Sequence, residues 1–303
     1  MSHFVACRAL CRGLFAAVAM NALISAAWGA DPSTSPGVAA TLSTTAANDF
    51  LDVQQVKEIA ALLPAGTKSL NVVMNLSTPP NKFLAPDGRT ALGTNPDLAR
   101  LMGRVFGVPV QFSNVAFDGI IPGLLSGQFD FSIASMGVTP ERTKVLDMID
   151  YAQWGSQAVS LKTSTVDVAN LCGLNVGAQL GSLQLAKLLP ELSTDCTGKG
   201  KKAINIVGLP SQQDALTQLT SGRLDAAFGD TPVMSYAVLK QPVFRVAGDE
   251  IRPLPITLST KKGSALTPAL VAAMKHIVTL PQYRESFRVW GLPHAAIDTV
   301  KLY

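Results

Sequence analysis

The sequence reads Ser126-Gly127-Gln128-Phe129-Asp130 at one point and Ser221-Gly222-Arg223-Leu224-Asp225 at another, 95 residues later. Each copy follows a stretch with apolar residues at helical spacing and precedes a run that favours a strand. A Ser-Gly-x-x-Asp turn between a helix and a strand is common, so five residues alone leave coincidence open. A genuine repeat would mean that the chain contains two similar α/β units.

The offset of the repeat also pairs two polar residues, Ser135 and Asp230. Both follow the strand expected after their copy of the motif, so they should lie at the carboxyl ends of equivalent strands. Open α/β sheets bind their ligands at this edge. We therefore expect a cleft that each unit lines from one side.

Strands and helices alternate along the chain around the first copy. The expected elements are a short amphipathic helix at 53–63, a strand at 70–74, a helix from the N-cap Asn95 to Gly107, a strand at 108–112, a helix from the cap Asp118 to Gly127, and a strand at 129–134. This alternation predicts the α/β class, with mostly parallel sheets covered by helices on both faces.

The first thirty residues predict export. Arg8 and Arg12 precede an apolar run at 14–27, and small residues follow it, which is the pattern of a secretory signal peptide. The alternative is an uncleaved anchor, but the run is shorter than the roughly 20 residues that a spanning helix needs. We assign 1–30 to a cleaved signal peptide and 31–67 to an N-terminal extension, and expect a periplasmic protein.

Cysteine usage agrees with export. Two of the four cysteines lie in the signal, which leaves Cys172 and Cys196 in the mature chain. Two cysteines in an exported protein predict one disulfide, with two buried free thiols as the alternative. No metal site or cofactor is expected, because His276 and His294 are distant from the cysteines and show no ligand spacing. The basic residues behind the net charge of +4 are scattered apart from 199–202, so we expect no nucleic-acid partner.

A longer set of motifs resembles the family 3 periplasmic solute-binding proteins, the amino-acid receptors of ABC importers. The motifs are Phe117-Asp118-Gly119-Ile120-Ile121-Pro122, the first Ser-Gly turn, Ser135-Met136-Gly137-Val138-Thr139-Pro140-Glu141-Arg142, Asp150-Tyr151, Asp225 to Val233, Tyr283, and Trp290-Gly291-Leu292. The resemblance covers roughly 69–293. With Leu171-Cys172-Gly173, the cysteine pair is similar to the disulfide-bearing branch of that family.

The resemblance implies a two-lobed (type II) binding-protein fold. Each lobe would be a mostly parallel sheet flanked by helices, with the ligand cleft between the lobes. We expect the first segment of lobe 1 at 68–161, lobe 2 at 162–256, and the return to lobe 1 with the C-terminal helices at 257–303. The partners would be a small amino-acid-like ligand and the membrane subunits of an ABC transporter, and the protein would be a monomer.

An amino acid carries a carboxylate and an ammonium, so its receptor needs a fixed cation and a fixed anion. Arg142 has the planar guanidinium that grips a carboxylate at two points, and the resemblance implies this role for it. The alternative is a surface ion pair of Arg142 with Glu141 or Asp147. Asp230 would accept hydrogen bonds from the ammonium, and it could also serve as the N-cap of the helix that follows it.

The resemblance also implies the rest of the site. Ser135 and the main chain of Gly137 would lie near the ligand, Ser182 would donate to its carboxylate, and Phe117 would pack on its side chain or simply fill the core. Leu183 stands where many relatives have a second hydroxyl. Asn75 and Thr78 stand where relatives place specificity residues, Asn75 at a position that is often acidic in receptors for basic amino acids. We therefore expect neutral amino acids to bind better than lysine, arginine or glutamate.

Two other functions remain open. Some relatives on this fold are cyclohexadienyl-type dehydratases, and a soluble protein of this kind could be the accessory binding protein of a periplasmic enzyme. The sequence offers no Ser/His/Asp constellation and no close pair of carboxylates in the cleft motifs. We expect no catalytic residues and a protein that binds rather than transforms its ligand.

Overall fold

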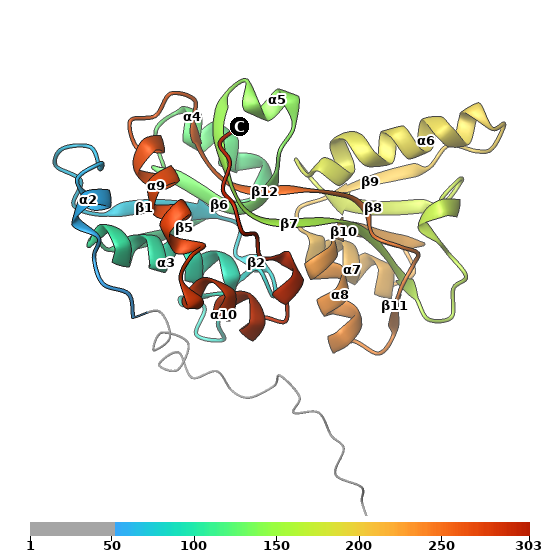
Figure 1. Ribbon diagram of the computed structural model, residues 1–303. Helices are drawn as coiled ribbons and strands as arrows, with labels where there is room; N and C mark the ends of the chain where they lie inside the picture. The colour runs from blue at the N-terminus through green and yellow to red at the C-terminus, as the bar shows by residue number, and fades with distance from the viewer. Residues whose placement is uncertain (1–51) are drawn as a thin grey trace, which may run out of the picture. The chain divides into compact units, whose positions relative to one another are not determined.

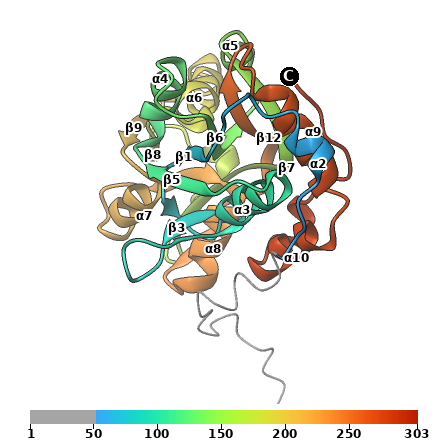
Figure 2. The ribbon, with the colours of Figure 1, turned by 90° about the vertical axis from the view of Figure 1, so that its left-hand side faces the viewer.

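The computed structural model describes residues 52–303, in which a nine-stranded sheet has helices on both faces (Figures 1 and 2). The expected signal peptide and most of the expected N-terminal extension lie outside these residues. The main sheet consists of β1 (Leu70–Met74), β5 (Val110–Asn114), β6 (Phe131–Gly137), β7 (Leu146–Leu161), β8 (Asn175–Gln179), β9 (Asn205–Leu209), β10 (Ala226–Asp230), β11 (Phe244–Val246) and β12 (Ile251–Lys261). A small second sheet consists of β2 (Ser77–Thr78), β3 (Lys82–Leu84) and β4 (Ala91–Leu92).

The helices follow the strands in alternation, as expected for the α/β class. They are α2 (Lys57–Ala60), α3 (Thr94–Phe106), α4 (Ile120–Leu125), α5 (Pro140–Thr143), α6 (Leu189–Gly198), α7 (Gln212–Thr220), α8 (Thr231–Lys240), α9 (Thr267–Ile277) and α10 (Pro281–Val289). Within residues 52–303, no helix combines the length and the apolar character that crossing a membrane requires.

The main sheet has two similar halves. Its order is β5-β1-β6-β12-β7-β10-β8-β9, with β11 added beside β7. The strands β5, β1 and β6 pair in parallel at one end, and β9, β8 and β10 pair in parallel at the other. Between these halves, β12 and β7 pair antiparallel with each other and with their outer neighbours.

The sequence repeat occupies equivalent places in the two halves, and its interpretation as a structural repeat is confirmed. Asp130 comes just before β6, and its Oδ2 accepts a hydrogen bond of 2.6 Å from the main-chain N–H of Asn71 in β1. Asp225 comes just before β10, and its Oδ2 accepts a bond of 2.8 Å from the N–H of Asn175 in β8. In each half the aspartate therefore ties the entering strand to the start of its parallel neighbour.

Buried apolar side chains divide the described residues into two lobes. One core cluster draws its members from 53–154 and 254–303, which we call lobe 1. Two other clusters draw their members from 158–251, which we call lobe 2. The chain passes between the lobes along β7 and β12, which run across the middle of Figure 1. Because residues 156–161 of β7 pair with β10 and β11, we propose crossings at 154–158 and 251–254 in place of 161–162 and 256–257.

Three expected details of the helices are wrong. The first helix is limited to α2, much shorter than 53–63. Asn95 is not the N-cap of α3, because the helix begins at Thr94 and is preceded by Gly93, where a Cβ would lie 2.4 Å from the carbonyl oxygen of Asn81. Asp118 is not a cap of α4, because it lies inside the 3-10 turn Phe117–Gly119. The end of α3 at Gly107, in the left-handed conformation, is confirmed.

The expected disulfide is confirmed. Cys172 follows the 3-10 turn Val168–Asn170, and Cys196 lies near the end of α6. Cys196 belongs to one of the two core clusters of lobe 2, and Cys172 packs against that cluster. The bond therefore ties the last turn of α6 to the segment that leads into β8.

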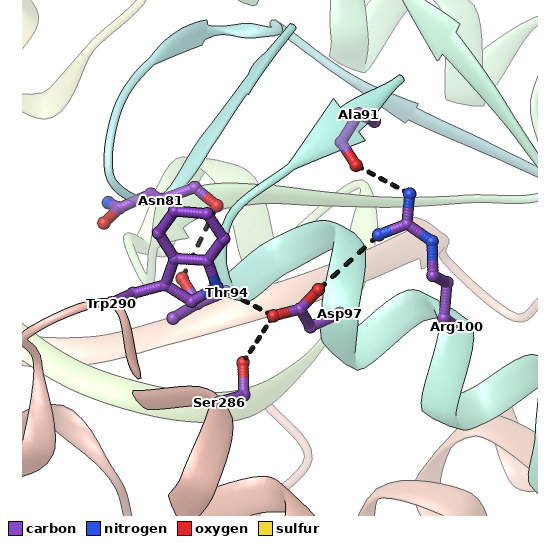
Figure 3. A network of polar contacts seen from close by, with 7 residues as sticks. All are labelled: Asn81, Ala91, Thr94, Asp97, Arg100, Ser286 and Trp290. Carbon is purple, nitrogen blue, oxygen red and sulfur yellow. Dashed lines mark hydrogen bonds and ion pairs between the residues drawn. The ribbon is translucent and has the colours of Figure 1, made fainter. Parts of the chain in front are cut away.

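A buried carboxylate attaches the C-terminal helix α10 to α3 (Figure 3). The Oδ2 atom of Asp97 accepts hydrogen bonds from Trp290 Nε1 at 2.8 Å and from Ser286 Oγ at 3.0 Å. Its Oδ1 lies 3.5 Å from Nη1 of Arg100. Burial raises the pKa of Asp97 to about 6, against the opposing effect of these partners. The contact joins segments that are far apart in the chain.

Replacing Asp97 by alanine should lower the free energy of unfolding by about 2 kcal/mol, because two buried or half-buried donors and the Arg100 cation lose their acceptor. Urea unfolding of the purified protein measures this change. Asp298→Ala is the matched control, since it removes a carboxylate that is 84% exposed and paired with Arg284, and should change the free energy by less than about 0.5 kcal/mol. Equal effects of the two substitutions would contradict the structural role of Asp97.

Candidate ligand-binding site

A narrow cavity lies where the two lobes meet. Both lobes and the strands between them contribute to its wall. The lining residues are Lys82, Phe117, Ala134, Ser135, Gly137, Arg142, Trp154, Gly155, Ser156, Gln179, Ser182, Leu183, Gln184, Gln212, Asp230, Leu254 and Ile256. Six of the eight ligand-binding residues expected from the sequence are therefore brought together, and Asn75 and Thr78 are not among them.

Arg142 lies in the short helix α5 and reaches both walls of the cavity. Its Nη1 donates a hydrogen bond of 2.8 Å to the carbonyl oxygen of Gly137 in lobe 1. Its Nη2 donates one of 3.0 Å to the carbonyl oxygen of Gly181 in lobe 2. Arg142 does not lie on the surface, because it is 9% exposed. Asp147, one of its two expected partners in a surface ion pair, pairs with Lys262 instead.

Burial lowers the pKa of Arg142 to about 10, and Asp230 opposes this shift, so the guanidinium stays charged at neutral pH. Phe117 flanks it, with the ring centroid 5.9 Å from the guanidinium carbon. Phe117 also belongs to the core of lobe 1, so it both fills the core and lines the cavity.

Asp230 ends β10 and faces the cavity from lobe 2. It occupies the N-cap position of α8, but its side chain makes no capping hydrogen bond. Its carboxylate instead accepts hydrogen bonds from Gln184 Nε2 at 3.0 Å and from Gln212 Nε2 at 3.2 Å. Burial raises the pKa of Asp230, while the charges of Lys82 and Arg142 and the two glutamine bonds lower it. The carboxylate of Asp230 therefore does not cap α8.

Ser135 is the centre of a polar cluster on the lobe 1 side. It adopts φ +62°, a conformation that is uncommon outside glycine. Its Oγ lies within hydrogen-bond distance of Lys82 Nζ at 3.2 Å, Asn95 Nδ2 at 3.1 Å and Asn81 Nδ2 at 3.4 Å. Three donors therefore converge on one hydroxyl.

Lys82 is the main cavity residue that the sequence did not reveal. It lies in β3, is 1% exposed, and pairs directly with Thr78 of β2. Directly opposed residues of antiparallel strands share a face of the sheet, and the longer side chain reaches Ser135. Burial lowers the pKa of Lys82 to about 8, and Asp230 opposes the shift.

Asn75 and Thr78 do not line the cavity, and their part in ligand binding stays a prediction. Both are buried, at 3% and 0% exposure. Their side-chain polar atoms make no hydrogen bond to any other described residue. Lys82, the strand partner of Thr78, does line the cavity.

The strand-to-helix turn of lobe 2 lies against the cavity as expected. Ser182 Oγ accepts a hydrogen bond of 3.2 Å from the N–H of Leu185, which leaves its own proton free to donate. Leu183 lines the cavity in place of a second hydroxyl. The next residues, Gln184–Leu188, form a π-helical turn, and Gln184 Nε2 also donates to Ser156 Oγ at 2.9 Å. Such turns are frequent at functional sites.

Comparison with known proteins agrees on one family. The model of the bacterial extracellular solute-binding proteins, family 3, matches residues 70–293. The arginine-binding protein ArgT of Corynebacterium glutamicum is 30% identical over 251 residues, which cover 80% of this chain and 82% of that protein. The ABC transporter arginine-binding protein 1 of Escherichia coli is 27% identical over 220 residues, covering 69% of this chain and 85% of that protein.

A solved structure shows the same similarity. The ancestral amino acid-binding protein AncCDT-1, a precursor of cyclohexadienyl dehydratase, superposes with a TM-score of 0.64 at 26% identity. The match covers 74% of this chain and 95% of that one. The two-lobed α/β fold expected from the sequence is thereby confirmed.

Proposed function

Because the chain belongs to the bacterial extracellular solute-binding proteins of family 3, we propose that it captures an amino acid and delivers it to an ABC importer. The observation that carries the proposal is the pair of buried, opposite charges, Arg142 from lobe 1 and Asp230 from lobe 2, in one cavity. A free amino acid presents two opposite charges of this kind. The arginine-binding relatives support the same class of ligand.

In this proposal Arg142 binds the carboxylate of the ligand. Two of its N–H groups already hold the carbonyl oxygens of Gly137 and Gly181, and the guanidinium has further donors. The hydroxyl of Ser182 and the main chain of Gly137 add contacts to the same carboxylate. Asp230 accepts hydrogen bonds from the ammonium with Ser135 beside it, and Phe117 packs against the ligand.

Ligand binding should also favour closure of the lobes. A ligand that contacts Arg142 and Asp230 touches both lobes at once, so it stabilises the closed state relative to an open one. The bond from Arg142 to Gly181 acts in the same direction, because it joins lobe 1 to lobe 2.

The place of action and the partners follow from the family. Its members are extracellular, and we propose a periplasmic protein whose signal peptide at 1–30 is cleaved. The importer partners would be the membrane subunits of an ABC transporter, and the protein would act as a monomer. The similarity to a precursor of cyclohexadienyl dehydratase makes a dehydratase the second candidate, with Lys82 as its acid–base group; we propose binding without turnover.

A thermal-shift screen of the purified protein over the twenty amino acids tests the proposal. At least one amino acid at 1,000 times its Kd should raise the free energy of unfolding by about 4 kcal/mol, because it binds the folded state alone. The same compound should be recovered unchanged after prolonged incubation, as seen by mass spectrometry. A flat response to all twenty would contradict an amino-acid receptor, and conversion of the compound would favour the dehydratase.

A further inference from the structure

The charged groups of the cavity do not balance. Of the residues that line it, two carry a positive charge, Lys82 and Arg142, and one carries a negative charge, Asp230. Lys82 and Arg142 are buried, and Asp230 is half-buried. A buried charge without a partner is costly. The side chains that line the cavity therefore carry a net charge of one positive unit.

Lys82 is the cation that lacks a partner. Its Nζ makes one hydrogen bond to a described residue, the neutral hydroxyl of Ser135 at 3.2 Å. Among the residues that the structure describes, no ion pair joins Lys82 to a carboxylate. Asp230 acts on it through the electrostatic field only; its carboxylate accepts hydrogen bonds from Gln184 and Gln212 and keeps acceptor sites for the ammonium of the ligand. An ammonium has three donors, so Lys82 has hydrogen bonds left to give.

We propose that the ligand is an acidic amino acid whose side-chain carboxylate binds Lys82. This inference rests on the proposed function, in which Arg142 and Asp230 hold the α-carboxylate and the ammonium. An acidic amino acid carries one net negative charge and would make the filled cavity neutral. A neutral amino acid would leave one positive charge buried, and arginine or lysine would leave two.

The proposal changes one expectation drawn from the sequence. Asn75 and Thr78 alone favoured neutral ligands over both basic and acidic ones. The positive charge of Lys82 favours glutamate and aspartate over neutral amino acids. The same charge disfavours basic amino acids further. The preference would also distinguish this chain from its arginine-binding relatives.

Calorimetry with charge-matched ligand pairs tests the proposal. Glutamate and glutamine, and aspartate and asparagine, have nearly the same shape and differ in charge. The better acid should bind the unmodified protein at least about thirtyfold more tightly than its amide, the effect expected of a desolvated charge pair. Lys82→Met keeps an unbranched side chain, one atom shorter, and removes the charge, so the preference should fall below about threefold.

The control variant is Lys68→Met, which removes the charge of an exposed lysine outside the cavity and should keep the full preference. The pH profile provides a readout that a structural role of Lys82 would not produce. Since the pKa of Lys82 is about 8, binding of the acid should weaken by up to about tenfold per pH unit above pH 8, as the ammonium loses its proton. Lys82→Met should show a weaker dependence, which is the part due to the ammonium of the ligand. Asp230, Arg142 and Tyr151, the other titratable groups near Ser135 or the cavity, are the same in both proteins.

Each outcome separates this inference from the proposed function. Tighter binding of glutamine, asparagine or arginine than of the acids would overturn the inference and leave the amino-acid receptor standing. Equal binding of glutarate and glutamate would overturn both, because a dicarboxylate without an ammonium would then be the ligand class. An acid preference that survives in Lys82→Met would show that another group reads the side chain and would overturn the role of Lys82.

Discussion

Replacing Arg142 by alanine is expected to weaken binding of the preferred amino acid by roughly thirtyfold to several thousandfold. The carboxylate of the ligand would lie in a closed cavity without its guanidinium partner. The variant also loses the bonds to the carbonyl oxygens of Gly137 and Gly181, so the lobes lose a contact with each other. Arg142→Lys should recover only part of the affinity, because an ammonium cannot reproduce a planar two-point grip.

Isothermal titration calorimetry measures this effect, with circular dichroism to establish that the variants are folded. Arg104→Ala is the matched control, since it removes an exposed arginine of α3 outside the cavity lining and should leave the affinity unchanged. Arg142→Ala should also bind the amino acid and its α-carboxamide equally, whereas Asp230→Asn should no longer distinguish the amino acid from its deaminated analogue. Affinity near that of the unmodified protein in both variants would mean that the cavity recognises another class of molecule.

Removal of the disulfide is the second large effect we expect. The double variant Cys172→Ala/Cys196→Ala should lose about 3 kcal/mol of unfolding free energy, because the bond closes a loop with a sequence separation of 24 in the unfolded chain. Ligand affinity should change little, since neither cysteine lines the cavity. Urea unfolding of the two proteins without reductant measures the first quantity and calorimetry the second.

Thiol labelling of the denatured protein without reductant supplies the control. The mature, exported chain should contain no free thiol, because its two cysteines are paired. Two labelled cysteines would show that the bond does not form in the cell. Unfolding at the same urea concentration with and without the cysteines would contradict the stabilising role of the bond.

The main elements of the fold could be predicted because their signals are local. The strand expected at 70–74 has those bounds, and the Ser-Gly-x-x-Asp repeat marks the same turn in both lobes. The end of α3 was predicted from Gly107 because a left-handed C-cap is a property of one residue. The start of α3 differs from the prediction because of tertiary contacts. Gly93 packs against the main chain of Asn81, and the side chain of Asn95 donates a hydrogen bond to Ser135 in place of capping the helix.

The cavity was predicted only where a motif marked the residue. Arg142, Asp230 and Ser135 lie in long motifs, and the structure brings all three to one cavity. Lys82 lies in a three-residue strand after two prolines, where no periodicity indicates burial. Its position follows from pairing with Thr78, and no local pattern of residues indicates that pairing. A lysine next to a predicted ligand loop is the one signal that could have drawn attention to it.

The glutamines that hold Asp230 were also missed, for a related reason. Gln184 opens the π-helical turn and Gln212 opens α7, so each looked like an ordinary polar residue at the start of a helix. Both donate hydrogen bonds to Asp230, although Gln184 lies 46 residues and Gln212 lies 18 residues away from it in the chain. Spacing along the chain carries no information about such a contact.

The pairing of β7 with β12 has a mechanical consequence. The two strands that connect the lobes pair with each other from Ile251 and Ser156 to Lys261 and Leu146, with register shifts between Ile251 and Leu254 and between Ile256 and Thr257, so they form a ribbon in place of two independent tethers. A paired ribbon resists sliding of one strand along the other, since each step would break its ladder, while it bends and twists with little loss of hydrogen bonding. We therefore expect the lobes to move by bending and twisting of this ribbon, and the two halves of the binding site to return to the same register after each release of ligand.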